Sequence, residues 1–111
     1  MTSPNSTFFI KQNDTLPVIQ EYLRNADGTA INLSGASVAF HMMFGDGTLK
    51  VNSGAVIDNA VTGLVHYAWV GVDTNTAGTF YREWQVTTAG GGIVTTPNWT
   101  DYPVQITAQI A

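Results

Sequence analysis

Apolar and polar side chains alternate along the centre of the chain, between Gly63 and Thr88. One face of the run Leu64–Val70 carries valine, tyrosine and tryptophan, and one face of the run Thr79–Thr87 carries phenylalanine, tryptophan and valine. A period of two is the signature of a β-strand with one buried face. A polar corner, Asp73–Gly78, separates the two runs. We therefore predict two strands that turn at this corner and pack through their apolar faces.

One residue breaks the alternation, because Arg82 falls on the same face as Phe80 and Trp84. We expect either that its guanidinium reaches the edge of the sheet along its aliphatic stem, or that the strand is bulged there. Aromatic side chains bring the largest apolar area per residue, so they should dominate the core. The predicted core anchors are Phe40, Trp69, Phe80, Trp84 and Ile106.

The rest of the chain consists of short β-rich segments punctuated by Gly, Asp and Asn, and no window favours a long helix. The most regular segment is Ser37–Phe44, in which alternate apolar residues share a face. The ordered part is expected to begin at Phe8–Lys11. Further extended segments are predicted at Leu16–Arg24, Ala30–Leu33, Leu49–Asn52, Ala55–Ile57, Ile93–Thr96 and Val104–Ile110. Seven to nine short strands in about 100 residues predict an all-β fold, an antiparallel two-sheet sandwich of the immunoglobulin-like type.

The length of 111 residues fits one domain with its own core. We expect residues 1–7 to form a flexible N-terminal arm and residues 8–111 to form the sandwich domain. Charged residues make up only 11 % of the chain, so Thr, Asn, Ser and Gly supply most of its polarity. The chain has no cysteine. A disulfide framework and thiolate metal sites are therefore excluded, and packing must hold the fold together.

Eight acidic and four basic residues give a net charge of −4, without blocks of either sign. Nucleic acid and anionic membranes are disfavoured as partners, because the sequence has no basic stripe. The first residues lack the positive and apolar regions of a signal peptide, and no run approaches the roughly 20 apolar residues of a membrane span. We therefore expect a soluble protein made in the cytosol.

Several short motifs follow one another in an order that is more specific than any one of them. They are Phe9–Pro17, Leu23–Phe40, Gly63–Trp69, Asp73–Val86, Pro97 and the closing run Val104–Ile110. In this order they resemble the immunoglobulin-like domain of tailed-phage structural proteins related to the N-terminal domain of the baseplate upper protein. The resemblance covers the chain from Phe8 to Ile110.

The resemblance implies a virion component, made in the cytoplasm of a bacterial host, that docks on other structural proteins of the particle. Capsid decoration, the neck and the tail or baseplate all remain open, with several symmetric copies expected on each particle. Baseplate upper proteins continue past this domain, so their host-binding role is not carried over. The family motif holds no catalytic residues and no cofactor, and we predict a non-enzymatic protein.

Few residues offer an alternative chemistry. His41 and His66 would form a metal pair if their strands were neighbours, but no third ligand lies at a recognisable spacing. Hydrogen-bonded histidines on strand faces explain them better. Asp58, Asp73 and Asp101 are isolated acids that fit turns better than a calcium loop. No nucleophile elbow is present, so we predict neither catalytic nor metal-binding residues.

Aromatic residues in a proline-bounded loop are the stronger candidates for an interaction surface, because aromatics are enriched at hot spots of interfaces. The alternative is that they cap the end of the sandwich. The predicted interface comprises Thr2, Ser3, Pro4 and Asn5 of the arm together with Trp99 and Tyr102. Sheet edges with few charges also invite pairing with another chain. A competing hypothesis is a carbohydrate-binding module, in which Trp99, Tyr102, Trp69 and Trp84 would stack on a surface glycan.

Overall fold

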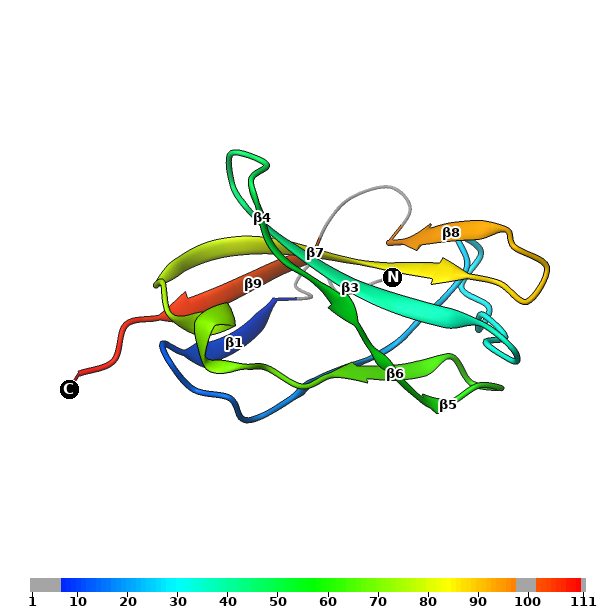
Figure 1. Cartoon of the computed structure of the whole chain (residues 1–111), viewed down its shortest axis with the longest axis horizontal. Helices are drawn as coiled ribbons and strands as arrows, with labels where there is room; N and C mark the ends of the chain where they lie inside the picture. Colours follow the sequence, from blue (N-terminus) through cyan, green and yellow to red (C-terminus); the bar gives the residue numbers. More distant parts are fainter. Residues whose placement is uncertain (1–6, 98–101, 111) are drawn as a thin grey trace.

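The computed structural model describes residues 7–97 and 102–110, and these residues form a sandwich of two β-sheets (Figure 1). The predicted fold class is thus confirmed. Among the described residues, no helix is long and apolar enough to cross a membrane. The strands are β1 (Phe8–Lys11), β2 (Ile19–Tyr22), β3 (Ser37–Phe44), β4 (Leu49–Gly54), β5 (Val56–Asn59), β6 (Leu64–Tyr67), β7 (Gly78–Thr87), β8 (Ile93–Thr96) and β9 (Tyr102–Thr107), with a 3-10 turn η1 (Gly71–Thr74) between β6 and β7.

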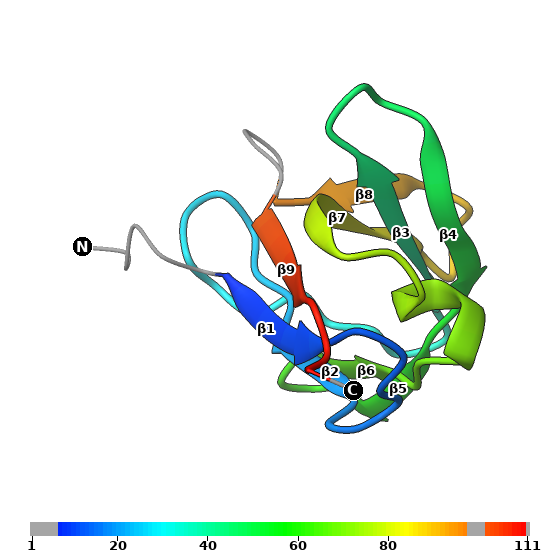
Figure 2. The ribbon, with the colours of Figure 1, turned by 90° about the vertical axis from the view of Figure 1, so that its left-hand side faces the viewer.

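The larger sheet has the strand order β1-β9-β7-β3-β4, and β8 pairs with the far half of β7. The smaller sheet has the order β2-β6-β5 and lies against one face of the larger sheet (Figure 2). All neighbouring strands run antiparallel except β1 and β9, which are parallel. β3 occupies one flank of β7, so β8 and β9 lie one after the other along its opposite flank.

The core lies between the two sheets and is built around Phe40. The unbroken register of β3 and β7 sets Phe40 opposite Trp84, with ring centroids 4.7 Å apart. From the smaller sheet Tyr67 stacks on Phe40 at 4.8 Å, and Trp69 meets the Phe40 ring edge-on at 5.6 Å. Such pairs contribute about 0.5–1.5 kcal/mol each beyond the area they bury. The five residues named as core anchors from the sequence are all buried: Phe40, Trp69, Phe80, Trp84 and Ile106.

The last strand is shorter than the alternation of apolar residues predicts. It ends at Thr107 rather than Ile110, and Ile110 is fully exposed. The reason is the length of its neighbours, because β1 ends opposite Thr107 and β7 begins opposite Ile106. An extended chain past that point has no ladder partner in either neighbour. At its other end the strand includes Tyr102, which the sequence had suggested for the preceding loop.

Three other segments also depart from the sequence-based expectation. The segment expected at Leu16–Arg24 forms only the four-residue strand β2, with Leu16 exposed and Pro17 unable to donate to a ladder. The segment Ala30–Leu33 contributes a single bridge, between Arg24 and Ala30. The strand β6 ends at Tyr67, although Trp69 still points into the core.

Gly63, which precedes β6, occupies a position that only glycine fits. Its φ of +77° lies in the left-handed region, and an added Cβ would stand 2.6 Å from the carbonyl oxygen of Leu23. The carbonyl of Gly63 in turn accepts the backbone N–H of Leu23 at 2.8 Å. This close approach of two backbones joins the start of β6 to the segment that follows β2.

We expect Gly63→Ala to lower the free energy of unfolding by more than about 1 kcal/mol, because both the strained φ and the backbone contact oppose a side chain. Gly54→Ala is the matched control, since its Cβ would meet no atom within 4 Å. That change should stay within about 0.5 kcal/mol. Urea unfolding followed by tryptophan fluorescence measures both. Equal effects of the two substitutions would contradict this account of Gly63.

Candidate interaction surface

Of the residues predicted to form an interface, the structure describes Tyr102. The others, Thr2, Ser3, Pro4, Asn5 and Trp99, lie outside the described residues. Tyr102 is the first residue of β9 and is half-buried. The guanidinium carbon of Arg82 lies 5.4 Å from the centre of its ring, close enough for a cation–π contact. Arg82 of the neighbouring strand β7 therefore holds the ring in place.

Arg82 is buried, with 6 % of its surface exposed, and both expectations for it are wrong. The register of β7 with β3 and with β9 is continuous through Arg82, so the strand is not bulged. The guanidinium does not reach solvent either. Its Nε donates to Oε1 of Glu21 at 3.0 Å, and its Nη1 donates to the carbonyl of Pro103 at 2.6 Å. The charge is thus satisfied inside the sandwich.

Glu21 makes this arrangement a link between the two sheets. It belongs to β2 of the smaller sheet, and the same Oε1 that accepts from Arg82 also accepts the indole N–H of Trp84 at 3.1 Å. The sequence does contain a signal for this pair. Glu21 occupies the inward position between Ile19 and Leu23, so opposite charges stand at inward positions of two strands. The pair fixes β2 against β7 and holds the start of β9 at Pro103.

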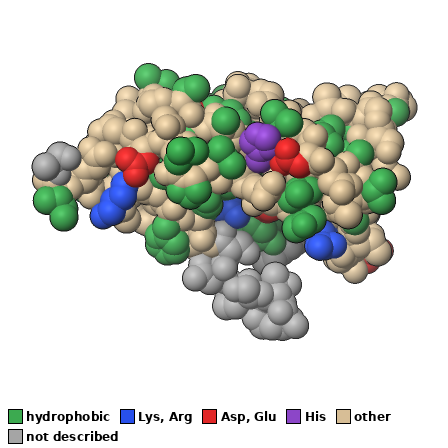
Figure 3. Space-filling view, turned by 90° about the horizontal axis from the view of Figure 1, so that it is seen from below, with side chains coloured by type: hydrophobic (Ala, Val, Ile, Leu, Met, Phe, Trp, Pro, Cys, Tyr) green, Lys and Arg blue, Asp and Glu red, His purple; other side chains and the backbone are tan. Residues whose placement is uncertain are grey.

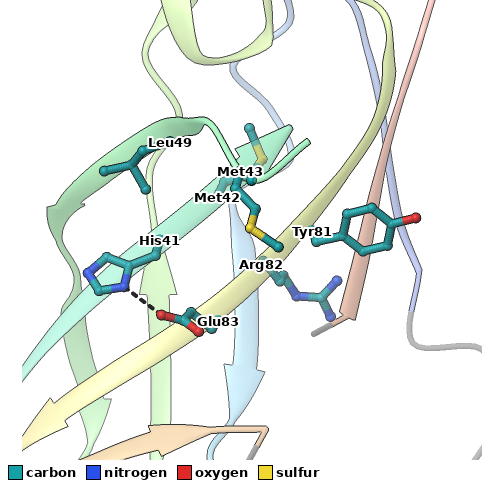
Figure 4. Close-up of a pocket in the computed structure, with 8 residues that line it drawn as sticks. His41, Met42, Met43, Leu49, Tyr81, Arg82 and Glu83 are labelled. Atoms are coloured by element: carbon teal, nitrogen blue, oxygen red, sulfur yellow. Dashed lines mark hydrogen bonds and ion pairs between the residues drawn. The ribbon is translucent and has the colours of Figure 1, made fainter. Parts of the chain in front are cut away.

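A small hollow of about 110 Å³ opens on the outer face of the larger sheet (Figure 4). It forms where the pairing of β3 with β4 shifts between Met42 and Met43, which leaves Lys50 without a partner in the ladder. Within the hollow, His41 Nδ1 and Glu83 Oε2 point toward each other at 2.9 Å. Its volume suits one inserted side chain. The residues around it are His41, Met42, Met43, Gly47, Leu49, Tyr81, Arg82 and Glu83.

The second histidine lies on the outer face of the smaller sheet. Nδ1 of His66 is 2.7 Å from Oδ2 of Asp58, and Gln20 donates to the same oxygen at 3.2 Å. The hydrogen bond from His66 is the main cause that lowers the pKa of the Asp58 carboxyl below its ordinary value. Figure 3 shows a histidine beside an acidic side chain among hydrophobic groups on this face.

The two histidines belong to different sheets, β3 and β6, and each has its own carboxylate partner. They cannot share a metal ion. In the described part of the chain, no three His, Cys, Asp or Glu residues come together as a metal site would require. Among the acids considered for calcium, Asp73 is buried and accepts the Tyr67 hydroxyl at 2.6 Å. Asp101 lies outside the described residues.

Two of the four residues suggested for glycan stacking are ruled out by burial. Trp69 is 4 % exposed and Trp84 is fully buried, so neither ring offers a face to a sugar. The exposed apolar surface lies elsewhere. A groove of about 260 Å³ runs beside β1 and the segment that leads to β2. Its rim includes Phe9 and Leu16, which are 61 % and 71 % exposed.

Comparison with known proteins shows the fold and leaves the family open. No protein-family model and no curated protein matches the sequence. Among solved structures, the N-terminal domain of phage TP901-1 ORF48 matches with a TM-score of 0.60 and 14 % identity, over 97 % of this chain and 91 % of that one. CopC from Methylosinus trichosporium OB3b matches with a TM-score of 0.57 and 13 % identity, over 97 % and 90 %. At such identities the similarity shows a shared β-sandwich fold.

Proposed function

We propose that the protein is a non-enzymatic structural component of a bacteriophage particle that docks on other virion proteins. The observation that carries the proposal is the match to the N-terminal domain of a phage protein, which extends over almost the whole of both chains. The ordered motifs from Phe9 to Ile110 resemble the same class of phage domain. Capsid decoration, neck and tail or baseplate positions all fit a domain of this kind.

The surface supplies the contacts that such docking needs. Phe9 and Leu16 offer exposed apolar area beside an open groove at the edge of the larger sheet. Burial of apolar surface is the main favourable term in association, and side chains seated in pockets contribute most of it. A single small contact would be weak. Copies that are joined to one another nevertheless attach firmly to a symmetric particle, because binding of one copy raises the effective concentration of the next.

The polar groups of the described surface support a structural role rather than catalysis. A hydrolytic site brings a nucleophile, a base and an orienting group within hydrogen-bond reach of one another. Here His41 pairs with Glu83 on one outer face, and His66 pairs with Asp58 on the other. Each histidine therefore has a single carboxylate partner that fixes its ring.

The test is incorporation into particles. We expect a tagged copy of the chain, expressed in the host during phage growth, to co-purify with virions through a density gradient at a constant ratio to the other particle proteins. Deletion of residues 1–6, or Trp99→Ala, should leave the fold intact and reduce that ratio at least severalfold. Quantitative mass spectrometry of the purified particles measures the ratio.

Val61→Ala provides the matched control, because Val61 is an exposed apolar residue in the turn between β5 and β6. It should incorporate as the unmodified chain does. Absence of the chain from purified particles would overturn the proposed function. Full incorporation of a variant with both the deletion and Trp99→Ala would instead overturn the assignment of those contacts, and the groove beside Phe9 would become the next surface to alter.

A further inference from the structure

The strand β8 is an edge of the larger sheet. It pairs with β7 through the four residues Ile93–Thr96, and its other side has no ladder partner among the described residues. Figure 1 shows it at the end of the sandwich, on the hairpin that follows β7. An edge strand presents a row of N–H and C=O groups that can pair with another chain.

The other four edge strands each carry a feature that discourages pairing. A charged side chain stands in each of β1, β2, β4 and β5, and in the last two it occupies a shift in the register. Charges and bulges are the usual protection of natural edges. These residues are Lys11, Glu21, Lys50 and Asp58. β8 has neither a charge nor a register shift, and all four of its residues are β-branched.

The stretch of sequence around β8 also carries no charge. No charged residue stands between Glu83 and Asp101 in the sequence. Arg24 lies close by, since its carbonyl accepts the Thr96 hydroxyl, but its guanidinium is turned onto the Tyr22 ring of the smaller sheet. The chain carries a net charge of −4, so two copies repel each other over most of their surface. β8 itself adds no charge to that repulsion.

We propose that β8 pairs with β8 of a second copy of this chain, antiparallel and about a twofold axis perpendicular to the sheet. The axis makes the larger sheets of the two copies continuous. The faces of the strand limit the register, because residues opposite each other must point to the same side. Ile93 and Thr95 point outward while Val94 and Thr96 point inward, since they pair with outward and inward residues of β7.

Of the registers that meet this condition, we take the one that sets Val94 opposite Val94 and Ile93 opposite Thr95 of the second copy, because it keeps every residue of the paired stretch within β8 and includes the exposed Ile93. Ile93 is 64 % exposed and Val94 is only partly buried, so both gain cover from the added strand. Pairs of β-branched residues across a ladder are favourable. The contact is short, so the dimer exchanges with monomer at micromolar or higher concentration. The pairing does not depend on the virion assignment, and either can fail while the other stands.

Sedimentation velocity of the full-length protein over a concentration series tests the pairing. We expect a reversible dimer that Thr95→Lys and Ile93→Asp each weaken by about tenfold, because each sets a charge on the shared edge. An equimolar mixture of the two variants should regain about that factor as a heterodimer, since the register places Lys opposite Asp. Thr62→Lys, at an exposed turn, is the control and should dimerise as the unmodified protein does.

Amide hydrogen exchange supplies the second readout, with protection of Ile93–Thr96 rising with protein concentration. A protein that stays monomeric up to about 1 mM overturns the proposal. So does a monomer in which the β8 amides are already protected, because the edge would then be covered from within the chain. A dimer that neither variant weakens places the interface elsewhere, and a dimer that both weaken without recovery in the mixture overturns the register.

Discussion

Glu21→Leu is expected to lower the free energy of unfolding by about 3–5 kcal/mol, the usual cost of removing one partner of a buried ion pair. The cost comes from the polar groups that lose the carboxylate of Glu21. Among the described residues, the guanidinium of Arg82 would keep the carbonyl of Pro103 as its one acceptor inside the sandwich, and the indole N–H of Trp84 would lose its acceptor. Urea unfolding at neutral pH measures the loss.

The double variant Glu21→Leu with Arg82→Met should recover most of that stability. Replacing both members of a buried pair by apolar residues of similar size is often neutral or stabilising, because neither charge then has to be desolvated. Some loss should persist, since the Trp84 N–H and the Pro103 carbonyl remain unpaired, at about 1 kcal/mol or more each. A double-mutant cycle gives the coupling energy directly. Additive losses in the double variant would show that the two side chains do not interact.

Glu83→Leu is the matched control for this experiment. Glu83 follows Arg82 on the same strand but points to the outer face, where its side chain is 35 % exposed and its carboxylate pairs with His41. Ion pairs in contact with solvent contribute little, so the change should cost less than about 1 kcal/mol. A loss as large as that for Glu21→Leu would mean that replacing either glutamate is equally costly. Burial of the Glu21–Arg82 pair would then not be the cause of the loss.

The ion pair also shows where sequence patterns stop being informative. The alternation that predicts β3 and β7 is local, and it survives in the structure because each strand has one face on the core. The partner of Arg82 lies 61 residues away in the other sheet. Which inward residues of two sheets meet depends on how the sheets are stacked, and no period within one strand contains that information. The sequence therefore identifies Arg82 as an exception without explaining it.

The limits of the strands and the identity of the edges depend on neighbours in the same way. β9 stops at Thr107 because its neighbours provide no further partners, although the apolar alternation continues to Ile110. The sparse charges of the edges were visible in the sequence, but not that Lys50 and Asp58 sit at register shifts while β8 has no such protection. Among the described strands, only the strand order shows that β8 is an edge without a charge or a register shift, unlike the edges β1, β2, β4 and β5.

The candidate interaction surface was only partly accessible from the sequence. A proline-bounded aromatic loop indicated Tyr102, but its place at the start of β9 and its contact with Arg82 follow from the pairing with β7. The apolar groove was not anticipated, because Phe9 and Leu16 belong to separate segments that meet only in the fold. Its signal was the second phenylalanine of β1, which points away from the core face of Phe8 and Ile10.

Asp73→Ala is expected to lower the free energy of unfolding by about 3 kcal/mol, from the loss of two hydrogen bonds to one buried carboxylate. Oδ2 of Asp73 accepts the Tyr67 hydroxyl at 2.6 Å and the backbone N–H of Val70 at 2.9 Å. These bonds close the corner between the two sheets, where η1 carries the chain from β6 to β7. Burial, with the neighbouring Asp73, raises the pKa of the Tyr67 hydroxyl well above its ordinary value, so that group stays a donor.

Tyr67→Phe separates the two bonds and serves as the comparison. It removes only the hydroxyl and keeps the ring that stacks on Phe40, so we expect a loss of about 1–2 kcal/mol, smaller than that for Asp73→Ala. Asp73→Ala should cost more, because it also removes the bond to the backbone N–H of Val70 and leaves the Tyr67 hydroxyl without its acceptor. Equal losses would mean that this N–H finds another acceptor or water when Asp73 is absent. The corner would then be held mainly by the hydrogen bond that the Tyr67 hydroxyl donates to Asp73.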